Sequence, residues 1–233
     1  MGLAENQSRT KRQDGGLLLT RGWLSRRDVE TQQLILGAMT AKAFEPGETL
    51  YRIGDSSSGV YGLAEGWVSV SIGADDGRET MVHASGPGFW IGDLSLLSDR
   101  ARQVTLVALG PVRALALSST TVTELVRDRP QLYRDFYDLT RDNMETALRI
   151  LGIDRVPHSD RRLALRLMQL AEPDPSSTPW LPLTQPLLAE LVSVSVPTLQ
   201  RAVARLVEAG LIEPGYGGLQ ILDRERLSKW GQC

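Results

Sequence analysis

Two polar side chains with the chemistry to recognise bases, Gln200 and Arg201, lie side by side on a predicted helix, 196–209. An amide matches the edge of adenine, and a guanidinium matches the edge of guanine, in the major groove of duplex DNA. The apolar residues of the helix recur at helical spacing and form its buried stripe: Leu199, Val203 and Leu206. Gln200, Arg201 and Arg205 therefore fall on its other faces, where they are available to a ligand.

The helix 196–209 has a predicted partner, 185–192, to which the turn 193–195 joins it. Thr184 and Ser195 each occupy an N-cap position two residues before a proline, which is the composition of a helix start. The segment 212–222, rich in glycine, predicts a small hairpin beside the pair. The pattern indicates a helix-turn-helix with a wing, and the alternative is an ordinary three-helix packing unit that binds no nucleic acid.

Composition excludes most other chemistry. The single cysteine, Cys233, allows no intrachain disulfide and no cysteine-based metal site, and thiol sensing is the weaker interpretation of it. The only histidines are His83 and His158, so a haem ligand or a metal cluster is poorly supported. We find no Ser/His/Asp set and no phosphate loop, so an enzyme is not expected. The cofactor prediction is none.

Charge and hydropathy set further limits. Lys and Arg number 26 against 28 Asp and Glu, a formal charge of −2, and residues 155–233 carry 9 basic against 8 acidic side chains. Any contact with DNA must therefore depend on a few phosphate contacts rather than on a basic field. The run Leu17–Leu19 is too short for a signal peptide, and no segment reaches the length of a membrane helix. We expect a cytoplasmic protein with no membrane partner.

Glycine spacing and hydrophobic period divide the chain into four predicted parts: a flexible tail at 1–21, a β-rich sensor at 22–122, a long helix at 123–154 and a DNA-binding domain at 155–233. A helix with Ser25 as its N-cap is predicted to Ala38. From Phe44 onward glycines punctuate short strands, among them Val68–Ile72, and Asp75–Gly77 supplies a hairpin turn. Many short strands favour an antiparallel sandwich or barrel.

The long helix carries two neighbouring apolar rows at steps of four and three residues. One begins at Leu132 and Phe136, and the other at Tyr133 and Tyr137. Such steps are typical of a coiled-coil seam. Both rows could pack on the chain's own sheet, or one could pack on the same helix of a second subunit, and we favour the second alternative. The residues predicted for the dimer interface are Phe136, Leu139, Asn143, Met144, Ala147, Ile150 and Leu151.

In the order of its motifs, the chain resembles the cyclic AMP receptor protein/fumarate-and-nitrate-reductase regulator (CRP/FNR) family of bacterial transcription factors. The specific stretches are Phe44–Asp55 (FEPGETLYRIGD) and Ile91–Leu96 (IGDLSL), followed by the long helix and the helix-turn-helix. The resemblance implies an α+β fold: an antiparallel β-roll of cyclic-nucleotide-binding type, a dimerisation helix and a C-terminal winged helix-turn-helix. It also implies a homodimer, a two-fold double-stranded DNA operator and RNA polymerase as partners.

The family's nucleotide pocket is altered in this sequence. The resemblance places the effector pocket at Gly92, Asp93, Leu94, Arg102, Gln103, Ala147 and Leu148. Asp93 replaces a glutamate, Gln103 replaces a small hydroxyl residue, and the adenine-contacting pair is Ala147 and Leu148, which donate no hydrogen bond. Arg102 is retained and either holds an anion or pairs with Asp93. Cyclic AMP is therefore disfavoured, and another small-molecule effector, or none, is expected.

The recognition helix also departs from the family pattern. Val196 and Pro197 stand where the family's base-reading Arg and Glu stand, and they offer only apolar contact with a thymine methyl group. We expect Gln200 and Arg201 to read bases. The full predicted DNA-contact set is Thr184, Ser195, Val196, Pro197, Thr198, Gln200, Arg201 and Arg205. The main hypothesis is a homodimeric, sequence-specific regulator, and the alternative is a ligand-binding or protein-interaction module whose helix-turn-helix no longer reads DNA.

Overall fold

The computed structural model describes residues 15–73, 77–98, 100–171 and 178–232. The chain divides into two compact units: the first runs up to Glu79 and from Ala84 to Glu145, and the second comprises Thr80–His83 and the chain from Thr146 onward. The helix α4 (Leu132–Asp154) is continuous across this division. Among the described residues, no single helix is long and apolar enough to cross a membrane.

The first described residues are packed rather than loose, which corrects the predicted tail for residues 15–21. Leu18 is fully buried in the core of the first unit, whereas residues 1–14 lie outside the described residues. A short 3₁₀ helix, η1 (Leu24–Arg26), precedes α2 (Val29–Ala38). Asp28, not Ser25, caps α2, since its Oδ1 accepts a hydrogen bond from the Thr31 amide at 2.9 Å.

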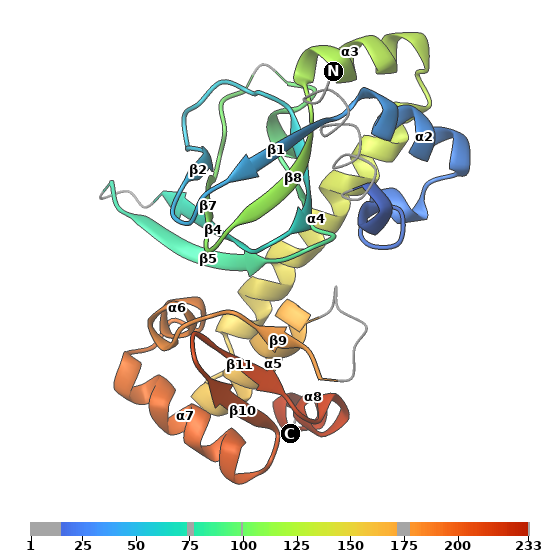
Figure 1. Cartoon of the computed structure of the whole chain (residues 1–233). Helices are drawn as coiled ribbons and strands as arrows, with labels where there is room; N and C mark the ends of the chain where they lie inside the picture. The colour runs from blue at the N-terminus through green and yellow to red at the C-terminus, as the bar shows by residue number, and fades with distance from the viewer. Residues whose placement is uncertain (1–14, 74–76, 99, 172–177, 233) are drawn as a thin grey trace. The chain divides into compact units, whose positions relative to one another are not determined.

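The β-roll consists of two four-stranded antiparallel sheets (Figure 1), and all of it except Thr80–His83 belongs to the first unit. Its eight strands are β1 (Thr40–Phe44), β2 (Thr49–Tyr51), β3 (Val60–Glu65), β4 (Val68–Gly73), β5 (Glu79–Ser85), β6 (Trp90–Ile91), β7 (Thr105–Ala108) and β8 (Val112–Leu117). One sheet has the order β1-β8-β3-β6, and the other has β2-β7-β4-β5. The predicted turn at Asp75–Gly77 falls mostly outside the described residues.

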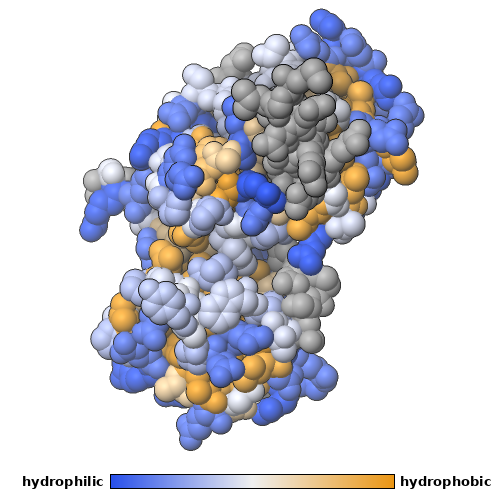
Figure 2. Space-filling model, viewed as in Figure 1, coloured by the Kyte–Doolittle hydropathy of each residue, from blue (hydrophilic) through white to orange (hydrophobic). Residues whose placement is uncertain are grey.

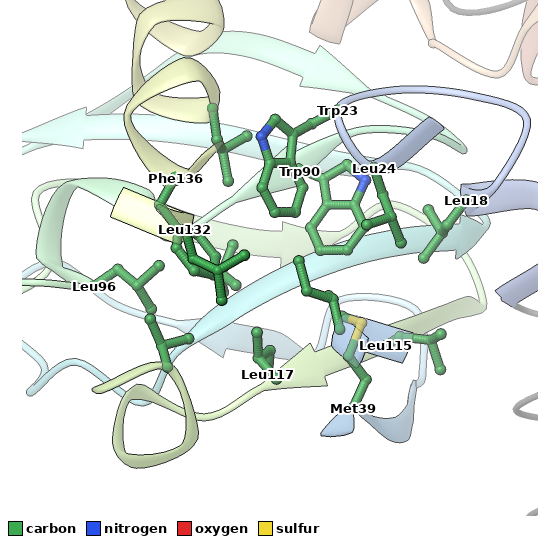
Figure 3. Packing of buried hydrophobic residues seen from close by; sticks show 14 of the residues in the cluster. Leu18, Trp23, Leu24, Met39, Trp90, Leu96, Leu115, Leu117, Leu132 and Phe136 are labelled. Carbon is green, nitrogen blue, oxygen red and sulfur yellow. The ribbon is translucent and has the colours of Figure 1, made fainter. Parts of the chain in front are cut away.

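Two apolar clusters hold the β-roll and its helices together. One lies between the sheets and includes Leu63, Val68 and Leu106. The other joins η1, α2, α3 (Ser119–Asp128) and the first part of α4 to the sheet that contains β8. Figure 3 shows Trp23 and Trp90 at its centre, with ring centroids 5.0 Å apart. This cluster fixes the side of α4 that the β-roll covers.

The second unit contains the winged helix-turn-helix, confirmed together with the other parts of the predicted fold class. Its elements are α5 (Ser159–Ala171), β9 (Trp180–Leu181), α6 (Gln185–Leu191), α7 (Val196–Glu208), the hairpin β10 (Ile212–Gly215) and β11 (Gly218–Ile221), and α8 (Arg224–Gln232). The predicted hinge at 152–160 is shorter than expected, because α4 continues through Gly152 to Asp154. The predicted loop at 172–182 lies partly outside the described residues.

Candidate functional site

The helix α7 presents one polar edge to solvent. Its apolar stripe is buried at Leu199, Val203 and Leu206, whereas Gln200, Arg201 and Arg205 are exposed. The axes of α6 and α7 differ in direction by 98°, within the range of helix-turn-helix pairs. Over α7, the face shown in Figure 2 is mainly hydrophilic with scattered hydrophobic residues.

Local hydrogen bonds orient the side chains at the start of α7. The Ser195 hydroxyl accepts from the Thr198 amide at 3.4 Å, as an N-cap requires. Arg201 Nη2 donates to Thr198 Oγ1 at 3.1 Å, and Gln200 Nε2 donates to Gln185 Oε1, also at 3.1 Å. Arg201 thus has one fixed contact and four further N–H groups, enough for a bidentate contact with guanine.

The other four predicted DNA-contact residues differ in their surroundings. Val196 and Pro197 are exposed at the first turn of α7, where the sequence places them. Arg205 lies 3.6 Å from an Asp160 carboxylate oxygen, so its charge is partly compensated by α5. Thr184 precedes α6 but makes no capping hydrogen bond with its side chain. The contact of all these residues with DNA stays a prediction.

The buried guanidinium of Arg102 lies at the position of the predicted effector pocket. Arg102 is 2% exposed. All of its described side-chain hydrogen bonds end on groups of the first unit. Nη1 donates to Gly92 O at 3.0 Å and Ser95 Oγ at 3.1 Å. Nη2 donates to Ser58 Oγ at 3.0 Å and Gly59 O at 2.5 Å. Four of the five guanidinium N–H groups are therefore used.

Tyr51 closes the remaining face of this guanidinium. The Arg102 Cζ lies 4.1 Å from the centre of the Tyr51 ring, a cation–π contact. Burial raises the pKa of the Tyr51 phenol, and the nearby Arg102 charge opposes that rise. The phenol is therefore neutral and its ring face is available to the cation.

Asp93 does not pair with Arg102, contrary to one of the two predicted alternatives. Asp93 Oδ1 accepts instead from Asn143 Nδ2 at 2.7 Å, and the same nitrogen donates to Trp90 O at 3.0 Å. Asn143 on α4 is thus a partner of the loop after β6. This contact is internal to the chain, and a role of Asn143 in a dimer interface stays a prediction.

Four other residues of the predicted effector pocket have exposed side chains. Leu94 and Gln103 are exposed, and Gln103 Nε2 donates to Ala101 O. Ala147 and Leu148 are exposed on the part of α4 that belongs to the second unit. Their role in effector binding stays a prediction.

The predicted dimer interface mixed the two rows of α4, and the structure separates them. Phe136 and Leu139 are buried in the core of the first unit, and Ile150 is also buried, so these three residues have little area left for a partner. Met144 and Leu151 are exposed, as expected for an interface. Three exposed residues of the same row were absent from the predicted set: Tyr133, Tyr137 and Leu148.

We call this row the α4 seam: Tyr133, Tyr137, Met144, Leu148 and Leu151. Each of the five side chains is more than half exposed. Their steps of four, seven, four and three residues keep them on one side of the helix. Such an apolar row on a long helix is the pattern of a helix–helix interface.

Comparison with known proteins identifies both units. Residues 41–129 match the cyclic nucleotide-binding domain, and residues 161–230 match the Crp-like helix-turn-helix domain. The chain belongs to the CRP/FNR family of transcription regulators. This CRP/FNR regulator carries a β-roll of cyclic-nucleotide-binding type, followed along the chain by a DNA-binding helix-turn-helix domain, as predicted.

Individual relatives of this CRP/FNR regulator span most of its length. A CRP-like cAMP-activated global transcriptional regulator of Mycobacterium tuberculosis is 25% identical over 191 residues, which cover 80% of this chain and 85% of the relative. The cyclic AMP receptor protein of Thermus thermophilus is 24% identical, covering 86% and 92% respectively. The structure of FixK2 from Bradyrhizobium japonicum shares the fold, with a TM-score of 0.73 at 18% identity, covering 82% and 96%. The curated relatives that match over this length are transcription regulators rather than enzymes.

Sequence reasoning missed the residues that surround Arg102. Ser58, Gly59 and Ser95 accept its hydrogen bonds, and Tyr51 covers it. Two of the four bonds end on backbone carbonyls, which have no sequence signal. The hydroxyl partners had one: the run Ser56–Ser58 directly before a buried strand supplies several acceptors in a short space.

Proposed function

We propose that this CRP/FNR regulator is a homodimer that binds a two-fold symmetric DNA operator through α7, in the cytoplasm and in contact with RNA polymerase. The observation that carries the proposal is the exposed edge of α7, on which Gln200 and Arg201 lie beside each other with donors to spare. In a symmetric dimer, two such edges fit half-sites separated by about one helical turn of DNA, roughly 34 Å.

The α4 seam supports the homodimer. Its five large apolar side chains face solvent in the single chain, although the opposite row of the helix is buried in the core. Pairing two copies of α4 along the seam removes this apolar surface from water, at about 25 cal/mol for each Å² buried. A two-fold pairing places identical residues against each other and generates the symmetry that the operator requires.

We further propose that cyclic AMP is not the effector. A cyclic phosphate at Arg102 would have to displace hydrogen bonds that the guanidinium already makes with the chain. The Gly59 and Gly92 carbonyls would then be left buried without a donor, at about 1–3 kcal/mol each. The combined cost of about 2–6 kcal/mol corresponds to a loss of affinity of at least 10-fold. The unliganded protein is therefore expected to bind DNA without cyclic AMP.

DNA selection tests the first part of the proposal. From a random duplex pool, the purified full chain should enrich a single palindrome. Arg201→Ala should weaken binding to that sequence by about 10- to 100-fold, the value of one bidentate base contact. Arg155→Ala removes the same charge from the same unit outside α7 and should have a much smaller effect. A pool without an enriched sequence would favour the alternative module that no longer reads DNA.

Sedimentation equilibrium tests the dimer. Tyr137→Lys places a charge in the middle of the α4 seam and should convert the dimer to a monomer at micromolar concentration. Glu145→Lys places the same side chain about a quarter-turn away on the same helix and should leave the dimer intact. A wild-type monomer at these concentrations, or a Tyr137→Lys dimer, contradicts the proposed interface.

Calorimetry tests the effector. Cyclic AMP titrated into the full chain should give no saturable heat at micromolar concentrations, and operator affinity should be the same with and without it. Micromolar binding that also strengthens operator binding would show that the Arg102 site opens to accept the nucleotide, and would contradict this part of the proposal.

A further inference from the structure

The first unit contains a second pocket, which we call the serine pocket. It has a volume of about 630 Å³, within the range of small-molecule sites. It lies where segments 56–57, 95–98 and 100–101 meet α3 and the start of α4. Its described lining consists of Ser56, Ser57, Ser95, Leu96, Leu97, Ser98, Arg100, Ala101, Ser119, Thr123 and Tyr133. This set contains none of the residues that the family resemblance assigns to the nucleotide.

The lining of the serine pocket is unusually rich in hydroxyl groups. Eight of its eleven described residues carry a hydroxyl or a guanidinium, whereas small-molecule pockets are mostly apolar. A hydroxyl group can donate one hydrogen bond and accept two. A ligand suited to such a wall has many hydroxyl groups of its own, as a polyol or sugar has.

Hydrogen bonds within the wall hold several of these hydroxyls in place. Ser57 Oγ and Ser119 Oγ lie 2.9 Å apart and join the 56–57 segment to α3. Thr123 Oγ1 donates to Ser119 O at 2.9 Å, and Ser98 Oγ donates to Leu94 O at 3.1 Å. Because these two hydroxyl protons are directed to the protein, the acceptor sides of Thr123 and Ser98 remain for a ligand's own O–H groups.

Charge selects an anionic end for the ligand. Arg100 is the one charged residue of the described lining, and no carboxylate is part of that set. An exposed guanidinium beside hydroxyl donors suits a phosphate group, which takes paired N–H and O–H donors. A sugar carrying a phosphate group satisfies both the hydroxyl wall and Arg100.

The wall of the serine pocket is also tied to Arg102. Ser95 lines the pocket, and its hydroxyl accepts from Arg102 Nη1. Ser58, next to the lining residue Ser57, accepts from Nη2. The buried guanidinium thus holds one lining residue, Ser95, and the neighbour of another, Ser58, by bonds that the chain makes without a ligand. Such preorganisation lowers the entropic cost of binding.

We propose that the serine pocket binds a phosphorylated sugar or polyol, with the phosphate on Arg100 and the hydroxyl groups on the serine wall. The proposal does not depend on DNA binding, because its test measures the ligand directly.

Calorimetry with the full chain tests this proposal, with glucose 6-phosphate and glycerol 3-phosphate as probes. At least one probe should bind at one site per chain with a dissociation constant below about 1 mM. Glucose and inorganic phosphate, which each carry half of the recognised chemistry, should bind at least about 10-fold more weakly.

Three variants locate the site. Arg100→Gln should weaken the bound probe by about 10-fold or more, because it removes the charge that pairs with the phosphate. Ser98→Trp fills the pocket from an exposed position and should abolish binding. Arg127→Gln removes an exposed arginine near the far end of α3, outside the described lining, and should leave affinity unchanged. Unfolding midpoints equal to wild type confirm that each variant folds.

Two results would overturn the assignment. One is the absence of saturable heat for both phosphorylated probes up to about 10 mM. The other is binding that survives both Arg100→Gln and Ser98→Trp, which would place the ligand elsewhere on the chain.

Discussion

Replacing Arg102 by methionine distinguishes a structural arginine from one reserved for a ligand. Methionine keeps an unbranched side chain that can pack on the Tyr51 ring, but it removes all the donors. In the structure these donors serve four acceptors of the same unit. If the arginine instead served only to bind a ligand phosphate, its loss would leave the free energy of unfolding almost unchanged.

The expected cost follows from the acceptors left behind. Ser58 is exposed and can turn to water, whereas Gly59, Gly92 and Ser95 are buried. A buried acceptor without a donor costs about 1–3 kcal/mol, so three of them predict a loss of at least about 3 kcal/mol. Partial relaxation of the 92–103 loop limits the upper value to about 5 kcal/mol, the usual range for breaking a buried charged network.

Urea unfolding of the full chain, followed by tryptophan fluorescence, measures this loss. Trp23, Trp67 and Trp90 belong to the first unit, whereas Trp180 and Trp230 belong to the second. Replacing Trp180 and Trp230 by phenylalanine in every protein compared restricts the signal to the first unit. With a slope of about 2 kcal/mol per M, the transition should move down by about 1.5–2.5 M urea. Arg127→Met, at an exposed arginine, should change the free energy of unfolding by no more than about 0.5 kcal/mol. A change that small for Arg102→Met as well would refute the conclusion that the hydrogen bonds of Arg102 within its own unit stabilise the fold.

Three further predictions test other parts of the chain. Gly92→Ala should destabilise the first unit by about 2 kcal/mol or more, since φ is +110° and an added Cβ would lie 2.6 Å from Gly59 O. Gly110→Ala, where nothing lies within 4 Å of an added Cβ, is the control in the same unfolding assay. Equal effects of the two substitutions would contradict the prediction. Burial lowers the pKa of His83 to about 3; because the unfolded chain then binds the extra proton, the free energy of unfolding should fall as pH is lowered from about 6.5 towards 3, by up to about 1.4 kcal/mol per pH unit. His83→Leu should flatten this slope in acid unfolding curves, and an unchanged slope would assign it to other groups. Tyr216, fully exposed at the tip of the β10–β11 wing, should contact DNA beside α7, so Tyr216→Ala should weaken operator binding by about 10-fold in a gel-shift assay without changing the dimer; unchanged affinity would remove the wing from the interface.

Elements whose signal is local could be predicted from the sequence. The alternation of β4, the prolines and caps of α6 and α7, and the buried stripe of α7 all act within a few residues. The structure places these elements within two residues of the predicted limits. The cap of α2 was wrong because Ser25 and Asp28 are both suitable residues. Ser25 lies inside η1, where its hydroxyl donates to Gly22 O, which leaves Asp28 to cap the helix.

Features that depend on tertiary packing could not be predicted in this way. Both rows of α4 are apolar, and only the docking of Trp23 and Trp90 against Phe136 decides which row is buried. Asn143 lies in the buried row, yet its role as a partner of Asp93 follows from the position of the loop after β6. Likewise the sequence singled out Arg102, but not its acceptors, which are backbone carbonyls and small hydroxyls that converge only in the folded roll.

The hydrogen bonds of Arg102 within its own unit bear on how a ligand could regulate the protein. In a pocket where an arginine lacks acceptors, an anion supplies them and thereby orders the loop around it. Here Gly59, Gly92, Ser58 and Ser95 supply those acceptors, so four guanidinium donors are engaged without any ligand. A ligand can shift an equilibrium only by binding one state better than another. If cyclic AMP is not the effector, as we propose, we expect a small molecule that regulates the protein to act at another surface that touches the same loop. The serine pocket is such a surface, because Ser95 belongs to both.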